Sequence, residues 1–129
     1  MKIRSLLGVM VLGGMVAVAT PSYAQFLDKA TAEKLFNGNT LAGHDFKYDR
    51  EVKIYFAPAG TYNRLDDLNN KEAGVWKIES DGQLCMKHAQ NWNCRNIKPL
   101  EKAGRYMLIK DGKKSLKVEA VLPGNPNNL

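Results

Sequence analysis

The feature that most constrains the fold is a series of short apolar stretches separated by turn signals, which fills the chain after residue 40. Candidate strands are expected at 41–48, 52–57, 61–65, 74–79, 83–88, 92–97, 105–109 and 115–122. The intervening residues are mostly Asp, Asn, Gly and Pro, which favour turns. Many short strands with regular turns are typical of antiparallel barrels and sandwiches. We therefore predict an all-β, mainly antiparallel fold, a small barrel or sandwich of about eight short strands.

One helix is expected before the first strand, over residues 28–37. Helix-forming residues fill this segment, Asp28 or Thr31 can cap its start, and Gly38 can end it. Thr31 and Leu35 fall on one face at helical spacing. We expect this single N-terminal helix to cover an end or an edge of the sheet.

The N-terminus has the pattern of a cleavable secretory signal. Lys2 and Arg4 give a positive start, residues 6–18 form an uncharged and mainly apolar run, and residues 22–24 read Ser-Tyr-Ala. Small residues three positions apart are what signal peptidase accepts. An uncleaved membrane anchor fits less well, because a spanning helix needs about 20 apolar residues. We predict cleavage between Ala24 and Gln25.

This cleavage site divides the chain into three parts. They are a signal peptide over 1–24, a single β-rich domain over 25–122 and a flexible tail over 123–129. The 105 residues left after cleavage suffice for one hydrophobic core. No later segment is long and apolar enough to span a membrane, and we expect a periplasmic or secreted location.

The net charge favours anionic partners. The whole chain carries +6, and the mature part carries +4 because Lys2 and Arg4 precede the cleavage site. Such a charge attracts small anions or anionic components of the cell envelope. The densest basic run, residues 110–114, contains Asp-Gly and is typical of a solvated hairpin tip. Nucleic acid is therefore not an expected partner.

The two cysteines, Cys85 and Cys94, both follow the predicted cleavage site. Export brings them into an oxidising compartment, and their spacing suits two strands joined by a short loop. We predict a structural disulfide on the outer face of this hairpin. A redox pair is usually closer in sequence, and a zinc site needs further ligands.

Strand parity assigns inner and outer faces, because alternate residues point to opposite sides of a sheet. It predicts that Leu116, Val118 and Ala120 face inward in the last strand. The same rule places both histidines of the chain on the apolar face, near strand ends. The candidate ligand-binding residues on this face are His44, His88, Arg95, Tyr48, Trp76 and Met86.

Two interpretations of these histidines stay open. In the first, the imidazole and guanidinium groups line a small pocket for an anionic or metal-bearing ligand. In the second, each histidine sits at a rim with an ordinary hydrogen bond. Met86 and His88 offer the soft and imidazole ligands that suit copper, but two ligands make a weak site.

The order of several short motifs resembles a family of small exported bacterial proteins of unknown function. The matching pieces are residues 35–40 (Leu-Phe-Asn-Gly-Asn-Thr), Gly43, residues 74–78 (Gly-Val-Trp-Lys-Ile), residues 81–85 (Asp-Gly-Gln-Leu-Cys) and Cys94. The resemblance implies a disulfide-bearing β domain. It implies no reaction and no catalytic residues.

The function expected from the sequence is that of an exported, non-catalytic binding domain of the cell envelope. Motifs of serine hydrolases, zinc proteases and phosphate loops are absent from the sequence, and no cofactor is expected. Two alternatives remain. The first is an envelope protein-interaction or inhibitor module, and the second is a copper carrier or minor hydrolase.

Overall fold

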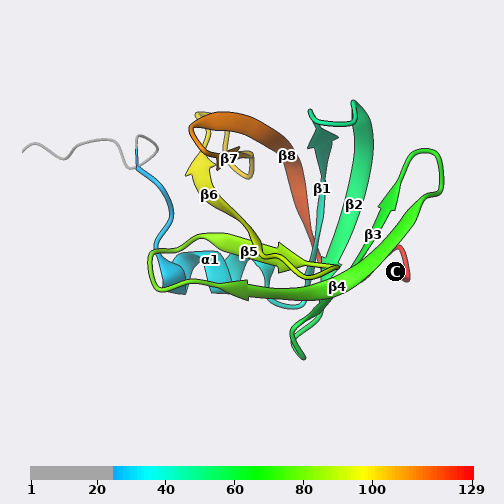
Figure 1. Ribbon diagram of the computed structural model, residues 1–129. Helices are drawn as coiled ribbons and strands as arrows, with labels where there is room; N and C mark the ends of the chain where they lie inside the picture. Colours follow the sequence, from blue (N-terminus) through cyan, green and yellow to red (C-terminus); the bar gives the residue numbers. More distant parts are fainter. Residues whose placement is uncertain (1–24) are drawn as a thin grey trace, which may run out of the picture.

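A computed structural model describes residues 25–129, so the predicted signal peptide over 1–24 lies outside the described residues. The domain is a closed antiparallel barrel whose eight strands follow one another in sequence order (Figure 1). The predicted fold class is confirmed, and the sheet takes the barrel form. The strands are β1 (Asn39–Asp45), β2 (Arg50–Phe56), β3 (Thr61–Asp66), β4 (Lys71–Ile78), β5 (Leu84–Lys87), β6 (Asn93–Pro99), β7 (Tyr106–Lys110) and β8 (Lys113–Pro123).

Closure of the barrel comes from the pairing of β8 with β1, the two strands farthest apart in sequence. Their ladder runs from Asn39↔Pro123 to Asp45↔Leu116. Because each strand has two neighbours, the sheet exposes no open edge to further pairing. The β7–β8 connection is a two-residue turn in which Asp111 and Gly112 both have positive φ. This is the geometry of the turn that favours right-twisted hairpins.

The predicted helix is α1 (Lys29–Phe36), which covers one end of the barrel. Figure 1 shows it at the end away from the β1–β2 and β7–β8 hairpins. Asp28 caps its first turn by accepting a hydrogen bond of 2.8 Å from the backbone N–H of Thr31. Phe36 is fully buried, and its ring centroid lies 5.2 Å from that of Phe56 in the barrel core. The expectation that the helix covers an end of the sheet is confirmed.

The hydrophobic core fills the helix end of the barrel. Its fully buried large side chains include Phe36, Leu41, Phe56, Tyr62, Leu84, Ile97, Leu108 and Val118. Most of these come from alternate positions of the strands, as parity predicts. Gly74 in β4 allows Tyr62 into this interior, because a Cβ at Gly74 would lie 2.7 Å from Cε2 of the tyrosine ring.

A β-bulge in β8 overturns the prediction for Ala120. Ala42 pairs with Ala120 while Gly43 pairs with Val118, so Glu119 is an extra residue in the ladder. Beyond an extra residue, the side chains that would have faced inward face outward, and the reverse. Val118 therefore belongs to the core as predicted, whereas Ala120 lies opposite the outward residue Ala42.

The predicted disulfide is confirmed, and it joins two residues that face each other across β5 and β6. The Cys85–Cys94 S–S distance is 2.02 Å. Cys85 also pairs with Lys77 of β4, on the side of the sheet away from its core neighbours Leu84 and Met86. The disulfide thus lies on the outer face, although Cys85 itself is fully buried.

The C-terminal residues are attached to β1. Strand β8 continues to Pro123, and the carbonyl of Gly124 accepts a hydrogen bond of 2.7 Å from the Thr40 hydroxyl. Within residues 25–129, no helix has the length and apolar character that a membrane crossing requires.

Candidate functional site

A cavity of about 190 Å³ opens into the barrel interior near the end opposite α1. We call it the mouth cavity. Its lining residues are Asp45, Lys47, Tyr48, Ile54, Tyr62, Arg64, Glu72, Met86, His88, Asn93, Arg95, Leu108, Lys110, Ser115 and Leu116. Each of the eight strands, or a turn next to it, contributes at least one of these lining residues. The barrel interior is therefore apolar at the helix end and polar at the mouth.

The floor of the mouth cavity is continuous with the hydrophobic core. Ile54, Met86, Leu108 and Leu116 belong to the core cluster and also line the cavity. Ligand sites commonly combine such an apolar surface with a few converging polar groups. A bound molecule would therefore meet hydrocarbon below and polar groups around it.

One side of the mouth, formed by β1, β3 and β4, holds both acidic residues of the cavity. Arg64 Nη2 lies 2.7 Å from Asp45 Oδ2, and both side chains are mostly buried. The Tyr62 hydroxyl donates a hydrogen bond of 2.6 Å to Glu72 Oε2. Burial, and then the hydrogen bond to Glu72, raise the pKa of Tyr62, so the phenol stays protonated and acts as a donor.

His88 adds to this acidic side from the end of β5. Its Nδ1 lies 3.6 Å from Glu72 Oε2. Glu72 is therefore approached by both Tyr62 and His88, and Asp45 is neutralised by Arg64. The two carboxylates have partners within the protein before any ligand arrives.

The other side of the mouth, formed by β6, β7 and β8, carries cations with neutral partners; we call it the cationic wall. Arg95 Nε donates a hydrogen bond of 2.7 Å to the Ser115 hydroxyl. Lys110 Nζ donates one of 2.6 Å to the Asn93 side-chain carbonyl. Among residues 25–129, neither cation forms an ion pair within 4.0 Å. The cationic wall thus has charge to offer to an anion.

Arg95 is the most deeply placed of these cations. Burial lowers the pKa of its guanidinium, although the nearby carboxylate of Asp45 acts in the opposite direction. Arginine nevertheless stays protonated in proteins at neutral pH. The lowered pKa therefore reports a buried positive charge whose loss of water is incompletely compensated.

Ser115 reaches the mouth because of a second bulge in β8. Leu108 pairs with Leu116 while Ile109 pairs with Lys114, which leaves Ser115 as the extra residue. Bulges commonly redirect a side chain in this way. Sequence reasoning missed Ser115, because the bulge depends on a partner strand.

Sequence reasoning also missed Asp45, Tyr62, Arg64, Glu72 and Lys110. The apolar pattern indicates the inner face of each strand, and these residues are polar. Alternation within β3 and β4 was the available signal. Tyr62 and Arg64 share a face, as do Glu72 and Trp76.

The prediction that His44 shares the inner face with His88 is wrong. His44 pairs with Glu51, on the side of β2 opposite the core residue Val52. The inward residue at this end of β1 is Asp45, which lines the mouth cavity. Phe46 and Tyr48 share the parity of His44, and in the sequence they resemble an apolar continuation of the strand. They belong to the turn after β1 and are both exposed.

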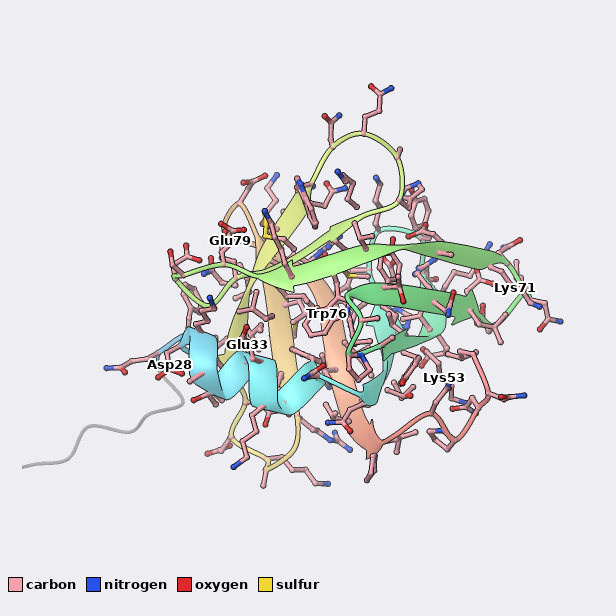
Figure 2. The ribbon with its side chains drawn as sticks, turned by 90° about the horizontal axis from the view of Figure 1, so that it is seen from below. Asp28, Glu33, Lys53, Lys71, Trp76 and Glu79 are labelled. Carbon is pink, nitrogen blue, oxygen red and sulfur yellow. A yellow bond between two sulfur atoms is a disulfide. The ribbon has the colours of Figure 1, made fainter. Side chains whose placement is uncertain are left out.

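The structure brings some of the predicted site residues together and separates others. His88, Arg95, Tyr48 and Met86 line the mouth cavity. Trp76 is inward but lies at the helix end, where its ring centroid is 5.3 Å from that of Phe56. Figure 2, seen from that end, shows Trp76 beside α1. Its indole N–H donates to the carbonyl of Ala57, which gives the tryptophan a packing role.

No family model and no curated protein matches this chain. Four cationic and two acidic side chains line the cavity, an excess of two positive charges. Within residues 25–129, no cluster of three or more His, Cys, Asp or Glu side chains is arranged to hold a metal ion.

Proposed function

We propose that this chain is an exported, non-catalytic binding domain of the bacterial cell envelope that holds a small anionic molecule in the mouth of its barrel. The observation that carries the proposal is Arg95. Its guanidinium is largely buried, faces a cavity and has only a neutral side chain, Ser115, as partner.

The burial of the Arg95 charge has a cost in free energy. A buried ion is unfavourable unless opposite charge and hydrogen bonds compensate for the lost water. Nε of Arg95 has one partner, and its two Nη groups have no hydrogen-bond partner within residues 25–129. A carboxylate or phosphate would accept from the free N–H groups and supply the missing charge.

A binding role fits the other polar groups of the mouth better than catalysis does. Asp45 is held by Arg64, and Glu72 accepts from Tyr62. A carboxylate tied to a cation or a donor is a poor general base, because the same interactions favour its unprotonated form. These groups are better suited to shaping and orienting a site.

Two observations support export and an envelope location. The first 24 residues have the secretory signal pattern, and a disulfide suits an oxidising compartment. We propose the periplasm as the compartment, reached after cleavage at Ala24-Gln25.

The test is a calorimetric titration of the exported protein with acetate, butyrate and succinate, using Arg95→Gln and a matched control. The control is Lys98→Gln, which removes one positive charge from the same strand, β6, at an exposed position outside the mouth cavity. We expect Arg95→Gln to weaken binding of at least one anion by about ten-fold or more, because a charge-assisted hydrogen bond is lost. Lys98→Gln should change the affinity less than two-fold.

Arg95→Gln should also leave the melting temperature of the free protein unchanged or raised, since it removes an incompletely compensated buried charge. The proposal fails if none of the three anions binds. It also fails if the Arg95 and Lys98 variants bind all three with equal affinity.

A further inference from the structure

We infer that the ligand is a small organic dianion whose two negative groups bind at different depths of the cationic wall, one on Arg95 and the other on Lys110. This inference rests on the proposed function, and it names the class of molecule that the mouth cavity selects.

Positive and negative charges are distributed unevenly around the mouth cavity. On the acidic side, Asp45 is neutralised by Arg64, and Glu72 lies beside Tyr62 and His88. That side therefore offers little net attraction to an anion. Arg95 and Lys110 have only Ser115 and Asn93 as hydrogen-bond partners, so the cationic wall offers two positive charges to a ligand. Two cations that lack an ion-pair partner on one wall favour a doubly charged partner over a singly charged one.

The two cations of the cationic wall, Arg95 and Lys110, lie at different depths of the mouth cavity. The β6–β7 ladder pairs Asn96 with Ile109, which makes Arg95 and Lys110 the next residues toward the mouth on adjacent strands. Lys110 Nζ then extends to Asn93, two residues farther toward the open end of β6. Arg95 Nε instead reaches across to Ser115 of β8.

The ammonium group of Lys110 thus lies near the rim, and the guanidinium of Arg95 lies deeper. One carboxylate is too small to satisfy both groups at these different depths. A molecule with two separated negative groups can satisfy both at once.

The size and polarity of the mouth cavity limit the ligand that it can hold. A cavity of about 190 Å³ is smaller than the usual pocket for a drug-sized ligand. Its floor includes Ile54 and Leu108, which can contact methylene groups but accept no hydrogen bond. The ligand therefore has a short carbon skeleton that joins its two charged groups and contacts the apolar floor.

The experiment compares succinate with butyrate, which have the same number of carbon atoms and differ by one carboxylate. Inorganic phosphate serves as a compact ion with little separation of charge. In calorimetric titrations of the exported protein, we expect succinate to bind at least ten-fold more tightly than butyrate, and more tightly than phosphate. Lys110→Gln should weaken succinate binding about ten-fold and change butyrate binding less than two-fold.

Two further variants complete the design. Lys110→Arg retains the charge and should keep succinate binding within three-fold of the unmodified protein. Arg95→Gln should weaken both succinate and butyrate, because both place a carboxylate on the guanidinium. Circular dichroism of each variant confirms that the barrel is intact.

The outcomes separate this inference from the proposed function. Equal affinities for succinate and butyrate, or a Lys110→Gln variant that binds succinate normally, would overturn the dianion while leaving an Arg95-dependent anion site. Tighter binding of phosphate than of succinate would overturn the inference that two separated negative groups bind at different depths, on Arg95 and on Lys110. Absence of binding by all three probes would overturn both.

Discussion

At the scale of single residues, one position along a strand decides the environment of a histidine. His44 lies on the outer face, where its Nδ1 is 2.5 Å from Glu51 Oε2 and its Nε2 is 3.0 Å from Asp49 Oδ1. The hydrogen bond with Glu51 is the main cause that raises the pKa of His44, and partial burial opposes it. This histidine thus lies on the surface between two carboxylates, whereas His88 lines the mouth cavity.

We predict that His44 titrates above 6.5, the value for an unperturbed histidine. A pKa that is higher in the folded state favours folding when the imidazole is protonated. The stabilisation is therefore complete below the unfolded pKa of 6.5 and disappears as the pH rises through the folded pKa. Nuclear magnetic resonance titration of the imidazole signals measures the midpoint directly.

Two variants test the cause of this shift. Glu51→Gln should move the His44 midpoint down toward its ordinary value, because the main partner loses its charge. His44→Gln should be less stable than the unmodified protein at about pH 5.5 and nearly equal to it well above the folded pKa. A His44 midpoint at or below the ordinary value, or one that Glu51→Gln leaves in place, contradicts the prediction.

At the scale of secondary-structure elements, the β5–β6 hairpin has the shortest ladder of the barrel. β5 has four residues, and its ladder with β6 comprises Leu84↔Arg95, Cys85↔Cys94 and Met86↔Asn93. The disulfide holds the middle pair together. It adds a covalent link to a ladder whose other two pairs contain Arg95 and Asn93.

We predict that replacing Cys85 and Cys94 together by alanine lowers the free energy of unfolding by about 2–3 kcal/mol. The loss arises because the reduced chain gains conformational freedom when unfolded. Alanine is preferred to serine because Cys85 is fully buried, and a serine there would bury a hydroxyl. Urea denaturation monitored by tryptophan fluorescence measures the change.

Anion binding by this variant at low temperature should remain within about two-fold, because the other seven strand pairings still form the barrel. Thiol labelling provides the control. If the native exported protein labels fully at both cysteines without reduction, the disulfide does not form in the cell and the prediction fails.

At the scale of the whole molecule, the barrel has two different ends. α1 packs on one end, where Ala32 and Phe36 complete the core, and the mouth cavity opens near the other. The chain enters the barrel at the helix end, and the backbone N–H of Leu27 donates to the carbonyl of Ile97 there. A signal peptide ending at Ala24 would therefore be attached at the end away from the mouth cavity.

We predict that the exported protein begins at Gln25, because the positive start, apolar run and Ser-Tyr-Ala sequence direct cleavage there. Intact-mass spectrometry of protein from the periplasmic fraction measures the N-terminus. Replacing Ala24 with a bulky residue, as in Ala24→Leu, should block processing at this site and leave the precursor with the membrane. Recovery of the unmodified protein with Met1 retained in the membrane fraction would refute the cleavage.

The sequence by itself determined the features that depend on near neighbours. The caps of α1, the turn at Asp111 and Gly112, and the Cys85–Cys94 hairpin were predictable because each involves residues close together along the chain. The inward side of β2 was equally clear, since Val52, Ile54 and Phe56 alternate with polar residues. The all-β class follows from these local signals together.

The tertiary structure alone decided the closure of the barrel and the composition of the mouth. Closure depends on pairing of β8 with β1, and the two bulges that redirect Ser115 and Ala120 arise in β8 ladders with β1 and β7. The alternation of inward and outward residues along one strand cannot reveal a bulge, because a bulge is defined by the pairing with the adjacent strand. The inner face also changes from apolar to charged toward the mouth, because water and partners on facing strands make charge tolerable there. Arg95 and Lys110 meet in one wall for that reason, and His44 lies outside it.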